Sequence, residues 1–183
     1  MIKKLVVGDL QENCYIIQND NDCVIIDAGD DYEQIKNYVT EHNLNILGIL
    51  LTHGHFDHCA ACYKFQQEGV KIYIHSLDAD KLYTDGNLAS LINKNFDKFK
   101  PDVLLEQGNL NLGQFEFYVI HTPGHSQGGV SYVYKNNVFC GDTLFENSVG
   151  RYDFYDGSLK KLRESIEILM QYKYKGYKFY YGH

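Results

Sequence analysis

The sequence predicts an α/β fold with two β-sheets and helices on their outer faces. Short β-rich runs come first, a helix and a buried strand follow, and the same order recurs in the second half. The chain has 183 residues, of which 44% are apolar, and this is enough to bury a sizeable core. Because no linker or repeat divides it, we expect residues 1–183 to form a single domain.

The first half of the chain begins with three short runs rich in β-formers, separated by polar turns, at 2–7, 14–18 and 23–27. Asp30 or Asp31 is then placed to cap a helix, which has Ile35, Tyr38 and Val39 on its inner face. The apolar run at 46–52 is typical of a fully buried strand. A helix at about 56–67, closed by a glycine, and a strand at 71–75 are expected to follow.

The second half is less regular at first, because residues 77–99 are polar and indicate helix or loop. Residues 115–121 alternate between apolar and polar, which predicts a strand, and 130–134 with 138–140 predict a hairpin turning at 135–137. Ser158 begins an amphipathic helix that has Leu162, Ile166 and Leu169 at helical spacing. A strand at 178–181 ends the predicted elements.

The run from Thr52 to His58 holds four potential metal ligands, which are His53, His55, Asp57 and His58. Imidazole and carboxylate are common ligands of zinc and of non-haem iron. Burying so many polar groups at the end of an apolar strand would be costly unless something bonds to them. The run therefore predicts a metal site.

Three more candidate ligands occur downstream, each directly after a glycine: His125, Asp142 and His183. Like His53, each of them follows a predicted β-segment. Side chains that leave strand ends can converge on one rim of a sheet. Seven ligands are enough for two metal ions that share one bridging group.

These motifs together resemble the metallo-β-lactamase superfold. The resemblance rests on the His-x-His-x-Asp-His run, Thr-Pro-Gly-His-Ser at 122–126, Gly-Asp at 141–142, Gly-His at 182–183 and the Asp27 turn at 26–29. It implies an αββα sandwich of two mixed β-sheets with outer helices. It also implies that Asp27 supports the site without being a ligand, and that Asp142 bridges two ions. The ligands so implied are His53, His55 and His125 on the first ion, and Asp57, His58 and His183 on the second.

The stretches 141–145 and 148–154 resemble the glyoxalase II branch, and more closely its short single-domain hydrolases. This likeness implies two zinc ions and a small-molecule thioester substrate, such as a hydroxyacylglutathione, cleaved by a hydroxide held between the ions. Asp57 and Asp142 would be the catalytic carboxylates, and Arg151 and Tyr152 would bind the thiol carrier. Members with a glutathione-binding helical domain are longer, and the superfold usually continues for about a helix after the last ligand, so we expect a truncated chain.

Two alternatives to a thioester hydrolase remain. A related branch of iron-dependent persulfide dioxygenases shares a similar Gly-Arg-x-Asp-Phe stretch, and would hold one Fe²⁺ with His53, His125 and Asp142. A catalytically weak metal-binding or interaction protein is the other alternative. A closed structural zinc site is not expected, because such sites favour cysteine ligands. The pair Cys59 and Cys62 has redox spacing, but buried helix positions are the simpler interpretation.

Charge and composition exclude some partners. The net charge is −7, so a nucleic-acid surface, which would need a basic face, is not expected. The longest apolar run, at 46–51, is too short to cross a membrane. The five cysteines are odd in number, and the apolar run after Lys3 and Lys4 is too short for an export signal, so we expect a cytoplasmic protein.

Overall fold

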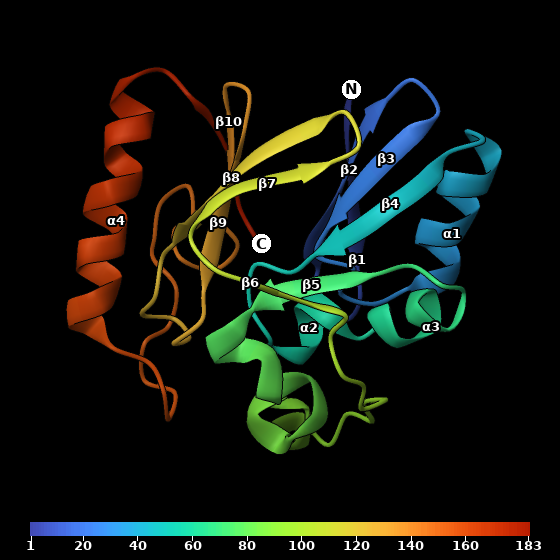
Figure 1. Cartoon of the computed structure of the whole chain (residues 1–183). Coiled ribbons are helices and arrows are strands. Elements are labelled where there is room, and N and C mark those ends of the chain that lie inside the picture. Colours follow the sequence, from blue (N-terminus) through green and yellow to red (C-terminus); the bar gives the residue numbers. More distant parts are fainter.

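Two β-sheets face each other in the computed structural model, which describes residues 1–183 (Figure 1). Helices cover both outer faces, so the layers run helix, sheet, sheet, helix across the molecule. This is the αββα sandwich of two mixed sheets that the sequence led us to expect, and the predicted fold is confirmed.

The first sheet has six strands in the order of the sequence, β1 to β6. The pairs β1–β2 and β2–β3 are antiparallel, and the three pairs from β3 to β6 are parallel. Helices α1 (Tyr32–Glu41) and α3 (Cys62–Gln67) pack on its outer face. The strands are β1 (Ile2–Val7), β2 (Glu12–Asn19), β3 (Asp22–Ile26), β4 (Asn45–Leu50), β5 (Ile72–His75) and β6 (Val103–Leu105).

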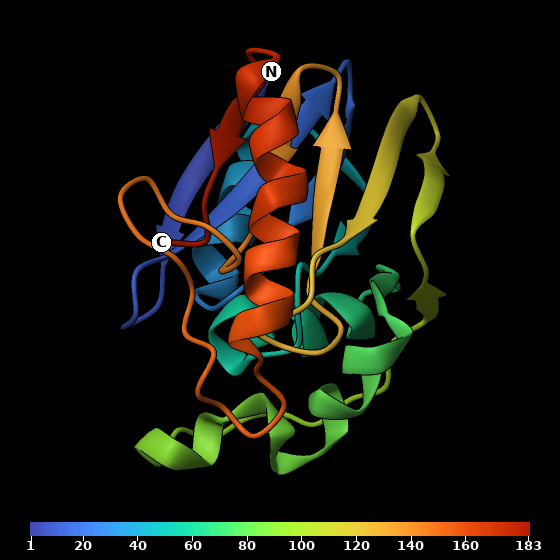
Figure 2. The same ribbon diagram turned by 90° about the vertical axis from the view of Figure 1, so that its left-hand side faces the viewer.

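The second sheet has five strands in the order β11-β10-β9-β8-β7. Its pairs are antiparallel except β10–β11, which is parallel. Helix α4 (Leu159–Tyr174) lies along its outer face (Figure 2), and the side chain of Ser158 caps the helix by accepting the Lys161 N–H. The strands are β7 (Gly108–Leu112), β8 (Phe115–His121), β9 (Val130–Tyr134), β10 (Asn137–Phe139) and β11 (Lys178–Tyr180).

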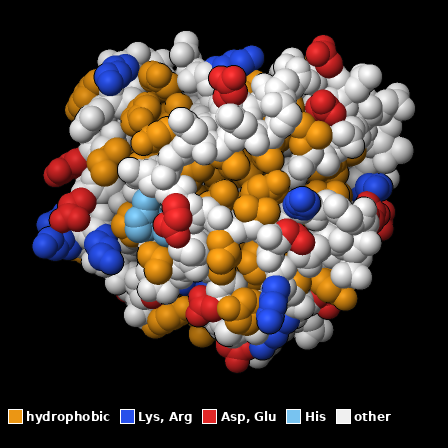
Figure 3. All heavy atoms as spheres, viewed as in Figure 1, with side chains coloured by type: hydrophobic (Ala, Val, Ile, Leu, Met, Phe, Trp, Pro, Cys, Tyr) orange, Lys and Arg blue, Asp and Glu red, His pale blue; other side chains and the backbone are white.

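The alternation of side chains along the strands divides the core into layers. In β2, Tyr15 and Ile17 point between the two sheets, and Cys14 and Ile16 point toward the outer helices. Because successive side chains of a strand face opposite sides, a strand buried on both faces is apolar throughout. On the face drawn in Figure 3, apolar side chains form a band across the centre, with charged side chains spread around it.

The helix expected at 56–67 is wrong in one respect, because it is broken into α2 (Phe56–Cys59) and α3. The N–H groups of Ala60 and Ala61 donate to the carbonyls of Gly29 and Ala28. The turn after β3 therefore supplies these two N–H groups with acceptors and interrupts the helix. The break fixes α2, which holds Asp57 and His58, against that turn.

Other departures from the expected elements are smaller. Strands β6 and β7 are not evident in the sequence, and residues 76–92 form three short 3₁₀ helices, η1 (Ser76–Tyr83), η2 (Asp85–Asn87) and η3 (Ala89–Ile92). Asp31 is at the N-cap of α1, but its carboxylate accepts the N–H of Gly8 and does not cap the helix. No helix is both long enough and apolar enough to span a lipid bilayer.

We expect Tyr132→Phe to lower the free energy of unfolding by about 1–2 kcal/mol, because it leaves a buried carbonyl without a donor. The Tyr132 hydroxyl donates to the Leu51 carbonyl at 2.6 Å and so joins β9 to the end of β4, just before the candidate ligands. Urea denaturation measures the effect. Tyr174→Phe is the control, because Tyr174 is 83% exposed and should change stability little. Equal stability of the two variants would contradict the prediction.

Candidate metal centre

The structure brings all seven predicted ligands together. His53, His125, Asp142 and His183 lie in the segments that follow β4, β8, β10 and β11, and Asp57 and His58 lie in α2. Their potential ligand atoms form overlapping groups in which all atoms lie within 4.8 Å of one another. Strand ends and one short helix thus place side chains from distant parts of the sequence around one point.

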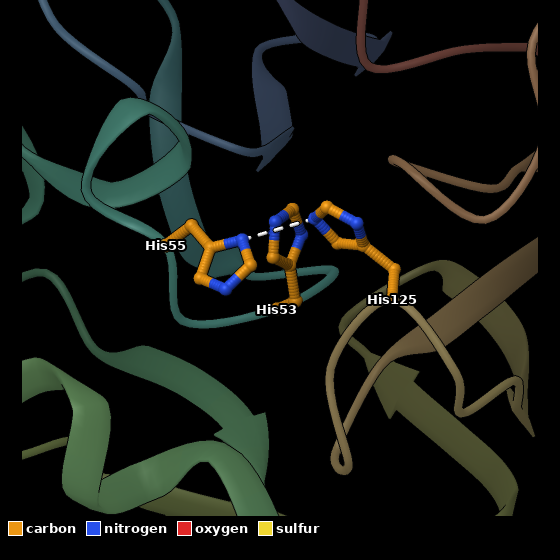
Figure 4. Close-up of side chains that lie close together, drawn as sticks. All are labelled: His53, His55 and His125. Atoms are coloured by element: carbon orange, nitrogen blue, oxygen red, sulfur yellow. Dashed lines mark hydrogen bonds between the residues drawn. The ribbon is translucent and has the colours of Figure 1, made fainter. Parts of the chain in front are cut away.

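The first group is His53, His55 and His125, and all three are buried. Their rings surround a common space (Figure 4), and Nδ1 of His55 lies 2.9 Å from Nε2 of His125. Nε2 of His53 is buried and has no hydrogen-bond partner. A buried nitrogen without a partner is costly, and binding a cation would remove that cost.

The second group is Asp57, His58 and His183. Nε2 of His183 lies 3.3 Å from Oδ2 of Asp57, and Nε2 of His58 lies 3.8 Å from the same oxygen. At metal–ligand bond lengths of about 2.0–2.2 Å, two ligands of one tetrahedral ion are about 3.3–3.6 Å apart. The separation of 3.3 Å lies in this range and that of 3.8 Å lies just beyond it, so a small movement of the His58 ring would let the group share one ion.

Asp142 lies between the two groups. One carboxylate oxygen, Oδ1, is 3.3 Å from Nε2 of His58, and the other, Oδ2, is 3.6 Å from Nε2 of His125 and 3.7 Å from that of His183. The approach is possible because residue 182 is glycine. A Cβ there would lie 2.1 Å from Oδ1 of Asp142 and 2.8 Å from the His58 ring.

Backbone carbonyls fix the tautomers of two of these histidines. Nδ1 of His125 is 2.7 Å from the carbonyl oxygen of Arg151, and Nδ1 of His183 is 3.0 Å from that of Leu10. Because a carbonyl oxygen only accepts, Nδ1 must be the protonated nitrogen in each neutral ring. Nε2 then presents its lone pair to the centre of the cluster, as a metal ligand must.

Asp27 fixes the tautomers of two further histidines, His58 directly and His53 through Thr52. It accepts from Nδ1 of His58 at 2.9 Å and from both the N–H and the hydroxyl of Thr52 at 2.7 Å. Since the Thr52 proton is used in this way, its oxygen accepts from Nδ1 of His53 at 3.1 Å. The sequence expectation that Asp27 supports the site without being a ligand agrees with this geometry.

The electrostatics of the cluster favour a cation. Burial lowers the pKa of His58, but the carboxylates of Asp142, Asp57 and Asp27 outweigh it and raise this pKa well above its usual value. Burial raises the pKa of Asp142, but His58, His125 and His183 together hold it below the usual range. The field that stabilises a proton on His58 also attracts a metal ion.

A buried ion-pair network, not foreseen from the sequence, ties together the loops that hold the ligands. Lys81 is fully buried and contacts Asp78 at 3.1 Å and Asp156 at 2.6 Å. Asp78 also accepts the N–H groups of Gly54, between two ligands, and of Gly128, just after a third. Such interactions join segments far apart in sequence, and no local motif indicates them.

Arg151 and Tyr152, the predicted substrate contacts, differ in position. Arg151 lines a cavity beside the ligands, where its guanidinium lies over the Phe154 ring and pairs with Asp153 through two hydrogen bonds. Tyr152 is exposed and is not among the residues that line this cavity. The structure thus places only the arginine beside the site.

Glu12, a buried residue near the site, was not predicted from the sequence. Glu12 of β2 is fully buried, neither of its side-chain oxygens has a partner, and Oε1 lies 3.9 Å from Nδ1 of His58. Burial, more than any neighbouring charge, raises the pKa of its carboxyl. The signal in the sequence is a glutamate two residues before the apolar run Cys14–Ile17.

The surroundings of the cysteines do not favour redox chemistry. All five are free and buried, and burial raises the pKa of the Cys59 and Cys62 thiols well above the usual value. A buried thiol with a raised pKa is a poor nucleophile. The structural interpretation of this pair is therefore the better one.

Comparison with known proteins identifies the family. The model of the metallo-beta-lactamase superfamily matches residues 7–183. The chain belongs to this superfamily. The His and Asp cluster is thus the metal-binding cluster of a metallo-β-lactamase fold.

Two curated relatives of this superfamily protein are similar over most of their length. The probable metallo-hydrolase YqgX of Bacillus subtilis is 36% identical over 90% of this chain and 81% of its own. The hydroxyacylglutathione hydrolase GloC of Haemophilus influenzae is 35% identical over 90% of this chain and 82% of its own.

Solved structures of metallo-β-lactamase-fold proteins superpose closely. The BLEG-1 B3 metallo-beta-lactamase has a TM-score of 0.92 and 35% identity, and covers 100% of this chain and 91% of its own. TTHA1623 in a di-iron-bound form has a TM-score of 0.88 and 34% identity, and covers 99% of this chain and 91% of its own.

We expect Asp27→Asn to weaken zinc binding by about 10- to 100-fold, the usual cost of losing a hydrogen bond to a ligand. If the amide nitrogen of the substituted side chain faces His58, it and the Nδ1–H of His58 are both donors. The ring must then move its proton from Nδ1 to Nε2, and a protonated Nε2 cannot bind the metal. Competition with a chelator measures the affinity. Asp22→Asn, at the other end of β3, is the control and should bind zinc normally. Unchanged affinity in folded Asp27→Asn would contradict the assigned tautomer.

Proposed function

We propose that this metallo-β-lactamase superfamily protein is a dinuclear metal hydrolase that cleaves thioesters. The observation that carries the proposal is that two three-residue ligand groups share one carboxylate, Asp142. In this assignment His53, His55 and His125 hold the first ion, and Asp57, His58 and His183 hold the second. Two Zn²⁺ ions are the proposed cofactors, since imidazole and carboxylate suit zinc.

Two bound divalent ions would lower the pKa of water toward neutrality and stabilise negative charge on the substrate carbonyl oxygen. The residues of this chain supply position. Asp142 sets the separation of the two ligand groups, and Asp57, whose side chain is 15% exposed at the cavity, can accept a hydrogen bond from the attacking water and orient it. Water's oxygen bonds to the carbonyl carbon, the carbon–sulfur bond breaks, and carboxylate, thiol and a proton result.

A thioester is favoured over other substrates by two arguments. The stretch at 148–154 resembles glyoxalase II-like hydrolases, and one relative carries the name hydroxyacylglutathione hydrolase. A thiolate is also a soft ligand that suits zinc as a leaving group. Arg151 at the cavity rim is the proposed contact for the anionic end of the thiol carrier, and Tyr152 beside it remains a weaker candidate.

The second candidate is a mononuclear iron persulfide dioxygenase that uses His53, His125 and Asp142. These three side chains lie together, and Oδ2 of Asp142 is 3.6 Å from Nε2 of His125. Two histidines and one carboxylate with open positions are the usual ligand set of such iron enzymes. The di-iron form of TTHA1623 also supports iron as a candidate metal.

Metal content and turnover test the function together. We expect about two zinc ions per chain and release of free thiol from a hydroxyacylglutathione. Asp142→Asn should lose metal and more than tenfold in turnover, because an amide is a poor bridging ligand. Asp20→Asn, an exposed acid in the turn between β2 and β3, is the control. One iron per chain with oxygen consumption would favour the dioxygenase, and full activity of Asp142→Asn would exclude the bridging role.

We expect Arg151→Ala to raise KM about tenfold for a thioester with an anionic carrier and to leave kcat unchanged, because this contact is present in ground and transition states alike. The exposed pair with Asp153 gives little stability, so a substrate can replace it. Steady-state kinetics measure both constants. Arg163→Ala, on the exposed face of α4, is the control. A fall in kcat at constant KM would move Arg151 to the reacting centre.

A further inference from the structure

A cavity of about 470 Å³ opens directly over both ligand groups. His55 and His125 of the first group and Asp57 and His183 of the second line it, together with the shared Asp142. Any substrate whose reacting carbon lies over these ligands must place the rest of its structure in or across this cavity. The residues that line the cavity therefore determine which substrates fit the site.

Apart from these ligands, the lining is almost entirely apolar. Eight of its fourteen residues are hydrophobic, and they come from separate segments of the chain. Leu88, Leu91 and Ile92 belong to the 3₁₀ region, Leu10 follows β1, and Val149 and Phe154 follow β10. The convergence of these segments on one apolar cavity is unlike the scattered single apolar residues of an ordinary surface.

The apolar side chains remain open to solvent although they adjoin the site. Leu91 is 69% exposed and Ile92 is 51% exposed. The Phe154 ring, by contrast, packs edge-on against His55 and His125, with centroids 5.1 and 5.5 Å away. An apolar surface therefore continues from the first ligand group out to the rim.

Beyond the ligand groups the cavity carries little charge. Outside the ligand groups, Arg151 is the one charged residue of the lining, and Asp153 pairs with it at 2.9 Å. A charged or hydrogen-bonding substrate group finds no partner on Leu88, Leu91 or Ile92, whereas an apolar group removes their exposed apolar surface from water. The lining thus favours apolar groups along Leu88, Leu91 and Ile92.

We propose that this cavity binds a linear apolar acyl chain, so that aliphatic acyl thioesters are better substrates than short hydroxyacyl thioesters. The inference rests on the proposed thioester hydrolysis and specifies its acyl group. The charged carrier extends past Arg151, and the acyl chain lies along Leu88, Leu91 and Ile92. A 2-hydroxyl on the acyl group gains little from this wall, because the wall offers no polar side chain to bond it.

A series of thioesters of one small uncharged thiol, N-acetylcysteamine, tests the proposal. The acyl groups are acetyl, butanoyl, hexanoyl and octanoyl, with lactoyl and propionyl as a pair matched in carbon number. We expect kcat/KM to rise roughly threefold for each added methylene until the cavity is filled. Propionyl should be cleaved at least as fast as lactoyl.

Two matched variants test whether the dependence of kcat/KM on chain length arises in this cavity. Leu91→Ser should lower kcat/KM for octanoyl about tenfold and leave acetyl within twofold, because only the longer chain reaches residue 91. Leu104→Ser is the control, since Leu104 is 58% exposed and does not line the cavity. Calorimetric binding of S-octyl-N-acetylcysteamine, a thioether that cannot be hydrolysed, should weaken by a similar factor in Leu91→Ser only.

The outcomes separate this inference from the function on which it rests. If no thioester of any length is cleaved, the proposed function is wrong, and the inference fails with it. If thioesters are cleaved but the rate is flat or falls with chain length, or lactoyl exceeds octanoyl, the function stands and the apolar acyl site is overturned. Equal thioether binding by wild type and Leu91→Ser overturns it as well.

Discussion

The carboxylate of Asp27 joins three parts of the protein that must keep fixed positions relative to one another. Asp27 directly follows β3. Its carboxylate accepts hydrogen bonds from the N–H and the hydroxyl of Thr52, at the end of β4, and from Nδ1 of His58 in α2. Asp27 has φ of 54°, a left-handed conformation that turns its side chain back over the strand ends. Short polar residues tolerate this conformation better than most. Through Thr52 the same carboxylate also orients His53, and so it reaches both ligand groups.

A second constraint comes from the other side of the site. The side chains of Lys81, Asp78 and Asp156 are buried, and Oδ1 of Asp156 has no hydrogen-bond partner, so the cost of burying these charges is only partly offset. The network uses its remaining hydrogen bonds on backbone N–H groups of the loops beside His53, His55 and His125. The network therefore contributes more to fixing the loops that carry the ligands than to the stability of the fold. The network thus fixes loops that hold three ligands, whereas Leu91 and Ile92, which line the cavity from η3, are exposed.

Much of this structure could be predicted from the sequence, and the rest depends on long-range contacts. The ligands could be predicted because imidazoles next to glycines, directly after β-rich runs, are costly to bury unless they bind a metal. Helix α2 ends early for a reason that lies about thirty residues away in the sequence, in the carbonyls of Ala28 and Gly29. Strand β6 is too short to show a period. The wall formed by Leu88, Leu91 and Ile92 was not predicted, because three apolar residues in a polar region gain meaning only when a site lies beside them.

The segment before His183 is held by the first strands of the chain. The carbonyl of Tyr181 accepts from the side chains of Asn13 and Tyr15, and the carbonyl of Gly182 accepts the N–H of Asn13. The two side-chain bonds span 168 and 166 positions of the sequence. Asn13 and Tyr15 are therefore synthesised long before Tyr181 and Gly182. Because His183 follows β11, the second ligand group proposed above can form only after β11 has been synthesised and has paired with β10. Any ion that this group holds can therefore be fully coordinated only after the first strands of the fold have met the segment after β11.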